Sequence, residues 1–157
     1  MKNNINRKNI TREVLHWDEI CTFEDMSENM IVENIGKVNW NLISYHQHLT
    51  EPFMERYGCY LNWNYISETQ KLSEPFIRKH HYKLDWRAIS KYQTLSEELI
   101  EEFHHKVDWK EVSKHQILSE SFIRKYQDKV EWMRISCNHR LTEEFVKEFQ
   151  AHLFFPS

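Results

Sequence analysis

Residues 107–132 read VDWKEVSKHQILSESFIRKYQDKVEW, a stretch that begins and ends on Val, an acidic residue and Trp. Its two tryptophans lie 23 residues apart, and the same interval separates all six tryptophans of the 157-residue chain: Trp17, Trp40, Trp63, Trp86, Trp109 and Trp132. A fixed period between about 20 and 50 residues is typical of tandem repeats. The chain is therefore predicted to be an array of six 23-residue units.

Other columns keep this register when each Trp is counted as position 1. Position 4 is Ile or Val, position 10 is Leu or Met, position 11 is Ser or Thr, and position 12 is always Glu. Position 5 is Ser except for Cys21, and position 8 is Gln in the four central units. The agreement across these columns makes the repeat specific.

Each unit is predicted to hold two short helices. Positions 1, 4, 5 and 8 share one helical face, and the Asn or Asp before most of the tryptophans is a favourable N-cap. The Ser or Thr at position 11 caps the second helix, whose apolar positions 14, 15 and 18 form a stripe. Pro52 and Pro75 fall in the first turn of that helix, where a missing N–H is tolerated. Gly36 and Gly58 fall where its C-cap is expected.

The expected fold is all-α, a helical-repeat solenoid of six helix–turn–helix units with about twelve short helices. Such helices are marginal in isolation, so stacked neighbours must bury their apolar faces in one continuous core. Residues 17–157 are predicted to form this single domain after a polar, basic segment at 1–16. Phe155, in the place of a seventh Trp, and Leu153 at position 22 indicate a closing segment, whose aromatic residues Phe154 and Phe155 either seal the core or meet a second subunit.

Charges on the second helices alternate in sign between units. Positions 16 and 17 read Arg78-Lys79, then Glu101-Glu102, then Arg124-Lys125. Equivalent helices of neighbouring repeats lie roughly 8–10 Å apart, which predicts ion pairs along the outside of the stack.

The totals favour a cytoplasmic protein. The net charge of −3 gives no global case for binding nucleic acid or an acidic membrane. No apolar run approaches the roughly 18–20 residues that cross a bilayer, and the N-terminus lacks the apolar core of a secretory signal. Cys21, Cys59 and Cys137 lie far apart with no CxxC motif, which suits a reducing compartment.

The unit at 107–132 resembles a repeat, VDWxxISxxQxLSExFIxxFxDKVDW, found in proteins of giant DNA viruses and in some phages and host-associated bacteria. The resemblance covers residues 17–155. It implies an α-helical repeat protein, in a family with no established enzymatic activity and no catalytic residues to transfer. A viral or phage origin further implies a factor that binds and blocks a host protein, such as a defence protein, in the host cytoplasm.

The repeated polar columns are interpreted as structural, so no enzyme and no cofactor are expected. A catalytic serine needs one activated hydroxyl beside a base, whereas the serines at position 5 form a ladder. Their hydroxyls are expected to bond a backbone carbonyl one turn back. The glutamines at position 8 are expected to satisfy backbone groups of loops.

The histidines raise the question of a metal site, above all the doublets His80-His81 and His104-His105. Neighbouring helix residues point about 100° apart, so neither doublet chelates a metal alone. His81 and His104 share position 19 in successive units, but no Cys or Asp completes a set of ligands. No metal site is predicted, and a pH-sensitive surface is the alternative.

Partner binding is expected on the first helices, at positions 3 and 7, opposite the core face. Clustered exposed aromatic and apolar residues mark interfaces, and one set of helices in a solenoid lines the concave ligand surface. The predicted function is therefore a protein-binding repeat module with an unidentified partner. Oligomer packing, or scattered aromatics without a role, is the alternative for these positions. The predicted binding residues are Phe23, Leu42, His46, Tyr65, Tyr92 and His115.

The alternative function is association with nucleic acid through the basic N-terminus and the more basic repeats. One Trp per unit would then stack one base, as in modular RNA readers. However, the Trp shares a helical face with the apolar residue at position 4 and is expected to be core. Base-stacking repeats also need flanking Arg and Lys, which a negative net charge does not favour. Membrane association is not expected.

Overall fold

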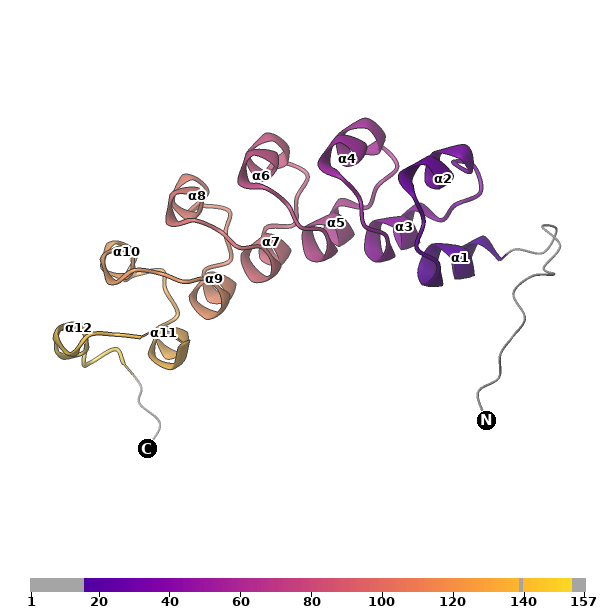
Figure 1. Cartoon of the computed structure of the whole chain (residues 1–157). Helices are drawn as coiled ribbons and strands as arrows, with labels where there is room; N and C mark the ends of the chain where they lie inside the picture. Colours follow the sequence, from indigo (N-terminus) through magenta and orange to yellow (C-terminus); the bar gives the residue numbers. More distant parts are fainter. Residues whose placement is uncertain (1–15, 139, 154–157) are drawn as a thin grey trace, which may run out of the picture. The chain divides into compact units, whose positions relative to one another are not determined.

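The computed structural model describes residues 16–138 and 140–153, which form twelve short α-helices and no strand (Figure 1). The predicted all-α helical repeat is confirmed, because each unit contributes one helix that begins at its Trp and one that begins at its Glu. The first helices are α1 (Trp17–Phe23), α3 (Trp40–His46), α5 (Trp63–Thr69), α7 (Trp86–Tyr92), α9 (Trp109–His115) and α11 (Trp132–Asn138). The second helices are α2 (Glu28–Glu33), α4 (Glu51–Tyr57), α6 (Glu74–His80), α8 (Glu97–Glu102), α10 (Glu120–Lys125) and α12 (Glu143–Glu148).

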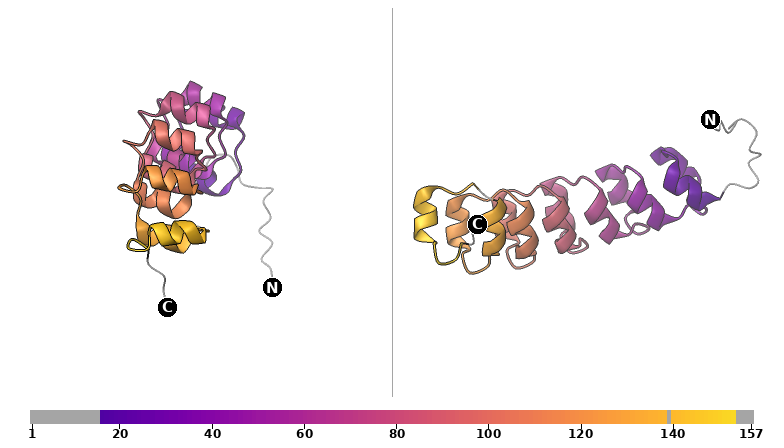
Figure 2. Two further views of the ribbon diagram at one scale, coloured as in Figure 1. Left: turned by 90° about the vertical axis from the view of Figure 1, so that its left-hand side faces the viewer. Right: turned by 90° about the horizontal axis from the view of Figure 1, so that it is seen from below.

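The contacts divide the chain into two compact units, Met1–Ile66 and Ser67–Ser157, with the boundary inside α5. In the second unit α7, α9 and α11 lie side by side in one row, and the second helices lie in another (Figures 1 and 2). In the first unit α1 packs on α3 in the same way. None of the helices in the described part of the chain is long and apolar enough to cross a membrane. The basic segment and the closing Phe154 and Phe155 fall outside the described residues and stay predictions.

The helices begin where the sequence supplies caps. The carboxylate of Asp85 accepts hydrogen bonds from the backbone N–H groups of Arg87 and Ala88, and Asn39 and Asp108 cap their helices in the same way. In the second helix of each repeat, the side-chain oxygen of the Ser or Thr at position 11 accepts a hydrogen bond from the backbone N–H three residues further along the chain. The two prolines lie in the first turns of α4 and α6, as predicted.

The predicted glycine caps are only partly correct. Gly58 is the C-cap of α4, but with a right-handed φ of −60°. The C-cap of α2 is Asn34, two residues before Gly36. No described residue has a positive φ, because the second helices end in turns that stay right-handed. Gly58 is needed for another reason, since an added Cβ would lie 2.7 Å from the Met54 carbonyl oxygen and 2.9 Å from the Trp63 indole.

In each of the two compact units, the hydrophobic core lies between the row of first helices and the row of second helices. In the first five repeats it is filled by the apolar residues at positions 4 and 15, such as Ile89 and Ile100, and closed by those at positions 10 and 22. The first repeat departs from this pattern, because Met30 at position 14 is partly exposed where later repeats bury Phe or Leu.

The glutamines at position 8 tie each repeat to the one before it. The Gln93 amide nitrogen donates to the carbonyl oxygens of Ser67 (3.1 Å) and Gln70 (2.8 Å), and its Oε1 accepts from the Leu72 N–H (3.0 Å). The carboxamide is buried, so the predicted role in satisfying loop backbone is confirmed. The same three bonds join Gln116 to Ser90, Gln93 and Leu95, and Gln47 to Cys21, Glu24 and Met26.

The serines at position 5 join each repeat to the one that follows. The Ser90 hydroxyl donates to the Trp86 carbonyl (2.6 Å), which confirms the predicted bond one turn back, and accepts from the Asp108 N–H (3.0 Å). Because Asp108 is the N-cap of α9, this bond fixes where the next first helix begins. The same hydrogen bond to the serine hydroxyl recurs in other repeats: the Asn62 N–H donates to Ser44, the Asp85 N–H to Ser67 and the Glu131 N–H to Ser113.

The glutamates at position 12 form a third ladder, which the sequence analysis missed. Glu74 accepts a hydrogen bond from the N–H of Ser96 (2.8 Å), the N-cap of α8. Burial alone would raise the pKa of Glu74, but the hydrogen bonds from Ser96 and the charge of Arg78 outweigh it and lower that pKa. The bond recurs from Thr50 to Glu28, from Ser119 to Glu97 and from Thr142 to Glu120.

The predicted alternation of charge on the second helices is confirmed. Arg78 pairs with Glu102 (2.7 Å), Arg124 pairs with Glu148 (2.9 Å), and Lys125 pairs with Glu101. Exposed pairs of this kind contribute about 0–1 kcal/mol each, so they influence which helices are neighbours more than the stability of the fold.

Replacing Gln93 with Met should destabilise the protein by about 3 kcal/mol, because two carbonyls and one N–H would lose their partners in a buried loop. The free energy of unfolding from urea titration measures this. The matched control is Gln127→Met at an exposed position, which should change it by less than about 0.5 kcal/mol. Equal losses in the two variants would contradict a role for the carboxamide.

Glu74→Gln tests the third ladder through pH. The pKa of Glu74 is lower in the folded state than its ordinary value of 4.5, so its contribution is fully present above that value and is lost as pH falls through the folded pKa. The variant should therefore be less stable than the wild type at pH 7, and the difference should shrink as the pH falls below 4.5 and through the folded pKa. The control Glu98→Gln, at an exposed position, should show no such change with pH in its thermal melting relative to the wild type. If the melting temperatures of Glu74→Gln and the wild type instead change with pH in parallel, the proposed role of the Glu74 carboxylate is wrong.

Candidate binding surfaces

The tryptophans are half-buried at the edge of each repeat, which corrects their prediction as core residues. The Trp109 indole N–H donates to the His104 carbonyl at 3.0 Å. The Tyr126 ring lies 4.9 Å from the indole and the Lys129 ammonium 6.0 Å above it. The indole bond recurs in Trp40, Trp63, Trp86 and Trp132. Because these indole N–H groups bond a carbonyl of the preceding repeat and the Trp109 ring packs on Tyr126 of its own repeat, the Trp column does not offer free platforms for bases.

Three of the predicted binding residues come together in the first unit. Leu42, His46 and Tyr65 line a shallow cavity of about 400 Å³ with Asn41 and Tyr45. The Tyr45 ring lies edge-on to Tyr65, with centroids 5.2 Å apart, and 4.8 Å from the His46 ring. We call Leu42, Tyr45, His46 and Tyr65 the aromatic cluster.

Tyr45 is not among the binding residues predicted from the sequence, because it stands at position 6 of its repeat rather than at position 3 or 7. Its contact joins position 6 of one repeat to position 3 of the next, a spacing of 20 residues that the 23-residue register does not display. Phe23, at the end of α1, is 82% exposed and is not among the residues that line the cavity.

The second unit contains Tyr92 and His115, the other two predicted residues. Tyr92 is 48% exposed, and its hydroxyl accepts a hydrogen bond from the Lys91 ammonium (2.8 Å). His115 Nε2 lies 3.4 Å from a carboxylate oxygen of Glu111. Glu111 itself is buried and lies 3.6 Å from Arg87 of the neighbouring helix. The expectation that position 3 always faces solvent is therefore wrong here, because adjacent first helices enclose it.

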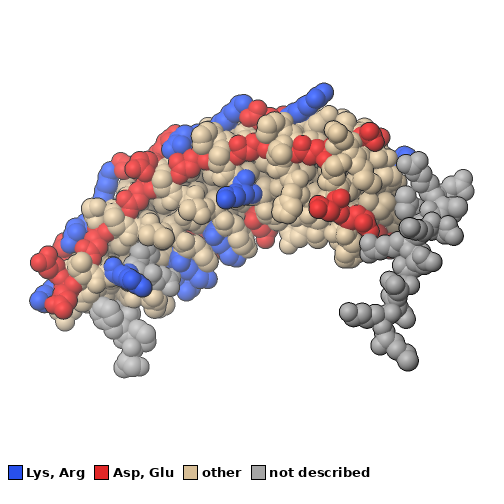
Figure 3. Space-filling model, viewed as in Figure 1, with Lys and Arg blue, Asp and Glu red and all other residues tan. Residues whose placement is uncertain are grey.

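The two helix rows of the second unit differ in charge. The first helices α7, α9 and α11 carry five basic residues and one acidic residue, a net charge of +4. The second helices α6, α8, α10 and α12 carry five basic and nine acidic residues, a net charge of −4. Figure 3 shows the two signs interspersed along the second helices. We call the basic residues of the first row the basic face: Arg87, Lys91, Lys110, Lys114 and Arg134.

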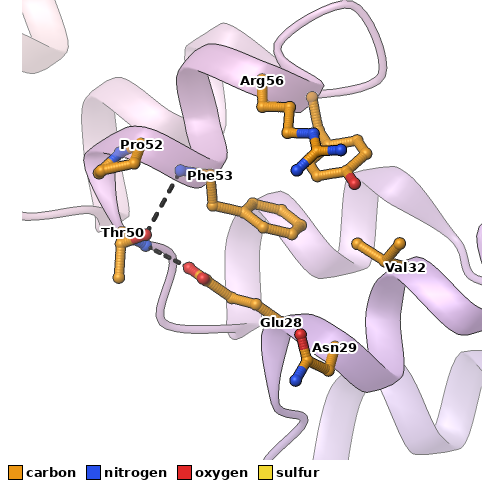
Figure 4. A pocket seen from close by; sticks show the side chains of 8 residues that line it. Glu28, Asn29, Val32, Thr50, Pro52, Phe53 and Arg56 are labelled. Carbon is orange, nitrogen blue, oxygen red and sulfur yellow. Dashed lines mark hydrogen bonds between the residues drawn. The ribbon is translucent and has the colours of Figure 1, made fainter.

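A second cavity, of about 360 Å³, lies between α2 and α4 (Figure 4). Its polar groups already cap helices, because Thr50 donates its N–H to Glu28 (2.7 Å) and accepts from the Phe53 N–H (3.3 Å). Arg56 lies over the Tyr57 ring. This cavity is a gap between neighbouring second helices rather than a site for chemistry.

The described histidines and cysteines form no shared metal site. The described residues contain no group of three His, Cys, Asp or Glu that could hold a metal ion. The His81 ring packs on Phe103 and contacts Lys106, while His104 bonds its own helix end. Burial raises the pKa of the Cys21 thiol, which suits a packing role at position 5.

No protein-family model, no curated protein and no solved structure matches this chain.

Proposed function

We propose that the chain is a protein-binding repeat module that contacts its partner through the exposed, variable residues of the first helices. The observation that carries this proposal is a division between constant and variable positions. The constant Gln, Ser and Glu columns bond within the stack. The variable positions instead differ from repeat to repeat, giving the aromatic cluster in the first unit and the basic face in the second.

The proposal is one of binding rather than catalysis. The hydroxyl of Ser90 both donates and accepts a hydrogen bond within the scaffold, so it is not held ready as a nucleophile beside a base. The Gln93 carboxamide likewise makes three bonds to the backbone of the preceding repeat. The residues that recur most strictly therefore support the fold.

The repeat resembles arrays in viral and phage proteins, and this resemblance indicates a class of partner and a compartment for the proposed binding. In that setting the partner is a host protein, and the bound module blocks its activity. Defence proteins are the first class of host protein to test, and the host cytoplasm is the compartment in which they would meet.

Nucleic-acid binding is the second candidate, favoured by the basic face. Phosphate groups are recognised mainly by Lys and Arg, and such binding weakens steeply as salt increases. Against it stands the Trp column, because the Trp109 ring packs on Tyr126 and its N–H bonds the His104 carbonyl of the preceding repeat.

The combined variant Phe23→Ala, Leu42→Ala, Tyr65→Ala and Tyr92→Ala tests the proposed function. Three of these side chains are exposed and Leu42 is half-buried, so helicity should be unchanged and the loss of stability about 1–2 kcal/mol. Affinity capture from a host lysate should retain a specific protein with the wild type and lose it with the variant.

The matched control replaces four exposed residues of the second helices with alanine and should capture the partner like the wild type: Glu55, Lys79, Glu98 and Glu144. Equal capture by wild type and the first-helix variant would refute the proposed surface. A collapse of the melting transition in that variant would show that its residues belong to the core.

A further inference from the structure

We propose that the outer face of the sixth repeat binds the outer face of the first repeat in a second copy of this chain, and that the carboxylate of Glu24 weakens this head-to-tail contact. The outer face of each repeat is the side on which a further repeat of the stack would pack. The contact uses the ends of the array, so it does not depend on the partner-binding positions of the first helices. Burial, charge and hydrogen bonding each support it.

The sixth repeat exposes apolar side chains at positions that the other five repeats bury. At position 10, Leu141 is half-buried, whereas its counterparts are at most 9% exposed. At position 15, Val146 is half-buried, whereas its five counterparts are 0% exposed: Ile31, Met54, Ile77, Ile100 and Ile123. Each of those five repeats is followed by another, so the following repeat is what covers positions 10 and 15.

The first repeat exposes apolar side chains on its opposite side. Met30 at position 14 is 37% exposed, whereas its counterparts in the later repeats are at most 6% exposed. Ile20 at position 4 is 8% exposed, whereas its counterparts are 0% exposed. Each later repeat has a repeat before it, so the preceding repeat is what covers position 14. A first repeat stacked after the sixth repeat of another copy therefore covers both faces, with Met30 and Val146 on the two sides of the contact.

The charges of the two faces match in the same register. Lys147 is at position 16 of the sixth repeat and Glu33 at position 17 of the first, and both are exposed. A second copy stacked head to tail therefore places Lys147 opposite Glu33, and opposite charges favour association of the two surfaces. The ion pairs between second helices join these same two positions of successive repeats: Arg78 with Glu102, Glu101 with Lys125, and Arg124 with Glu148.

Glu24 is the residue of this contact that departs from the repeat. It is the C-cap of α1 with φ −98° and ψ 141°, close to the −94° and 147° of Gln47 at the C-cap of α3. A glutamine with this backbone would donate to two carbonyl oxygens of the repeat before it, as Gln93 does. An ionised carboxylate has no hydrogen to donate, and burying it against carbonyl oxygens is unfavourable. The carboxylate of Glu24 therefore opposes a contact that the apolar and charged residues favour.

Sedimentation equilibrium of the full chain with Glu24→Gln tests this proposal. The substitution should tighten self-association by at least about tenfold relative to the wild type, because it replaces a buried charge with a bonded carboxamide. Species larger than a dimer should form, since each added copy leaves one face of each kind open. The matched control is Glu98→Gln on α8, which removes the same charge at an exposed position and should associate no more tightly than the wild type.

Two further changes in the Glu24→Gln chain locate the contact. Met30→Glu should reverse the tightening, and helicity should be unchanged because Met30 is exposed in the single chain. Lys147→Glu and Glu33→Lys should each weaken association, whereas an equimolar mixture of the two chains should associate more tightly than either alone, because opposite charges face each other again.

Three results would overturn the proposal. The first is association of Glu24→Gln no tighter than that of the wild type. The second is association that Met30→Glu leaves unchanged, which would place it on another surface. The third is a mixture of the two charge variants that associates no more tightly than either chain alone. Capture of a partner through the first helices is measured separately and is unaffected by these results.

Discussion

The fold depends on a buried carboxamide that crosses from one repeat to the one before it. The Ser67 carbonyl in the last turn of α5 and the backbone groups of Gln70 and Leu72 in the loop after it are buried away from water. Leaving such groups without partners costs about 1–3 kcal/mol each. Gln93 supplies all three partners from the following repeat. The described loops that hold Met26, Leu72 and Leu95 are satisfied by a glutamine of the following repeat, and the helices, each about two turns long, are therefore stable only as a stack.

The first repeat differs from the central repeats in its residue at position 8. Glu24 stands there in place of Gln, and it is exposed. Its own loop is satisfied by Gln47 of the second repeat. The Ser and Glu columns act in the same sense, since each fixes an N-cap in the following repeat and so determines where its helices begin. Because the side chains of these columns form hydrogen bonds within the stack, we propose that the partner is bound at positions whose residue differs from repeat to repeat.

Much of the fold could be predicted from the sequence because the strongest signals are local. The N-caps, the prolines in the first turn and the Ser bond one turn back all involve residues within four positions of each other, and all are observed. The partner of Glu74 could not be predicted, because it lies 22 residues away and depends on how two repeats stack. The exposure of the tryptophans was misjudged for a related reason. A helical wheel describes one helix, whereas the indole of Trp109 extends past the start of its helix to the carbonyl of His104. The aromatic cluster was found only in part, since the contact of Tyr45 with Tyr65 joins two different columns.

Hydrogen–deuterium exchange of the amides of Leu72 and Leu95 tests the central claim most directly. Both residues lie in loops outside any helix, and both donate their N–H groups to a glutamine of the next repeat. If the carboxamide ladder holds the stack, these two amides are protected to the level of a core helical amide such as that of Ile100. Exchange of Leu72 and Leu95 as fast as that of their loop neighbours Lys71 and Thr94 would contradict the account.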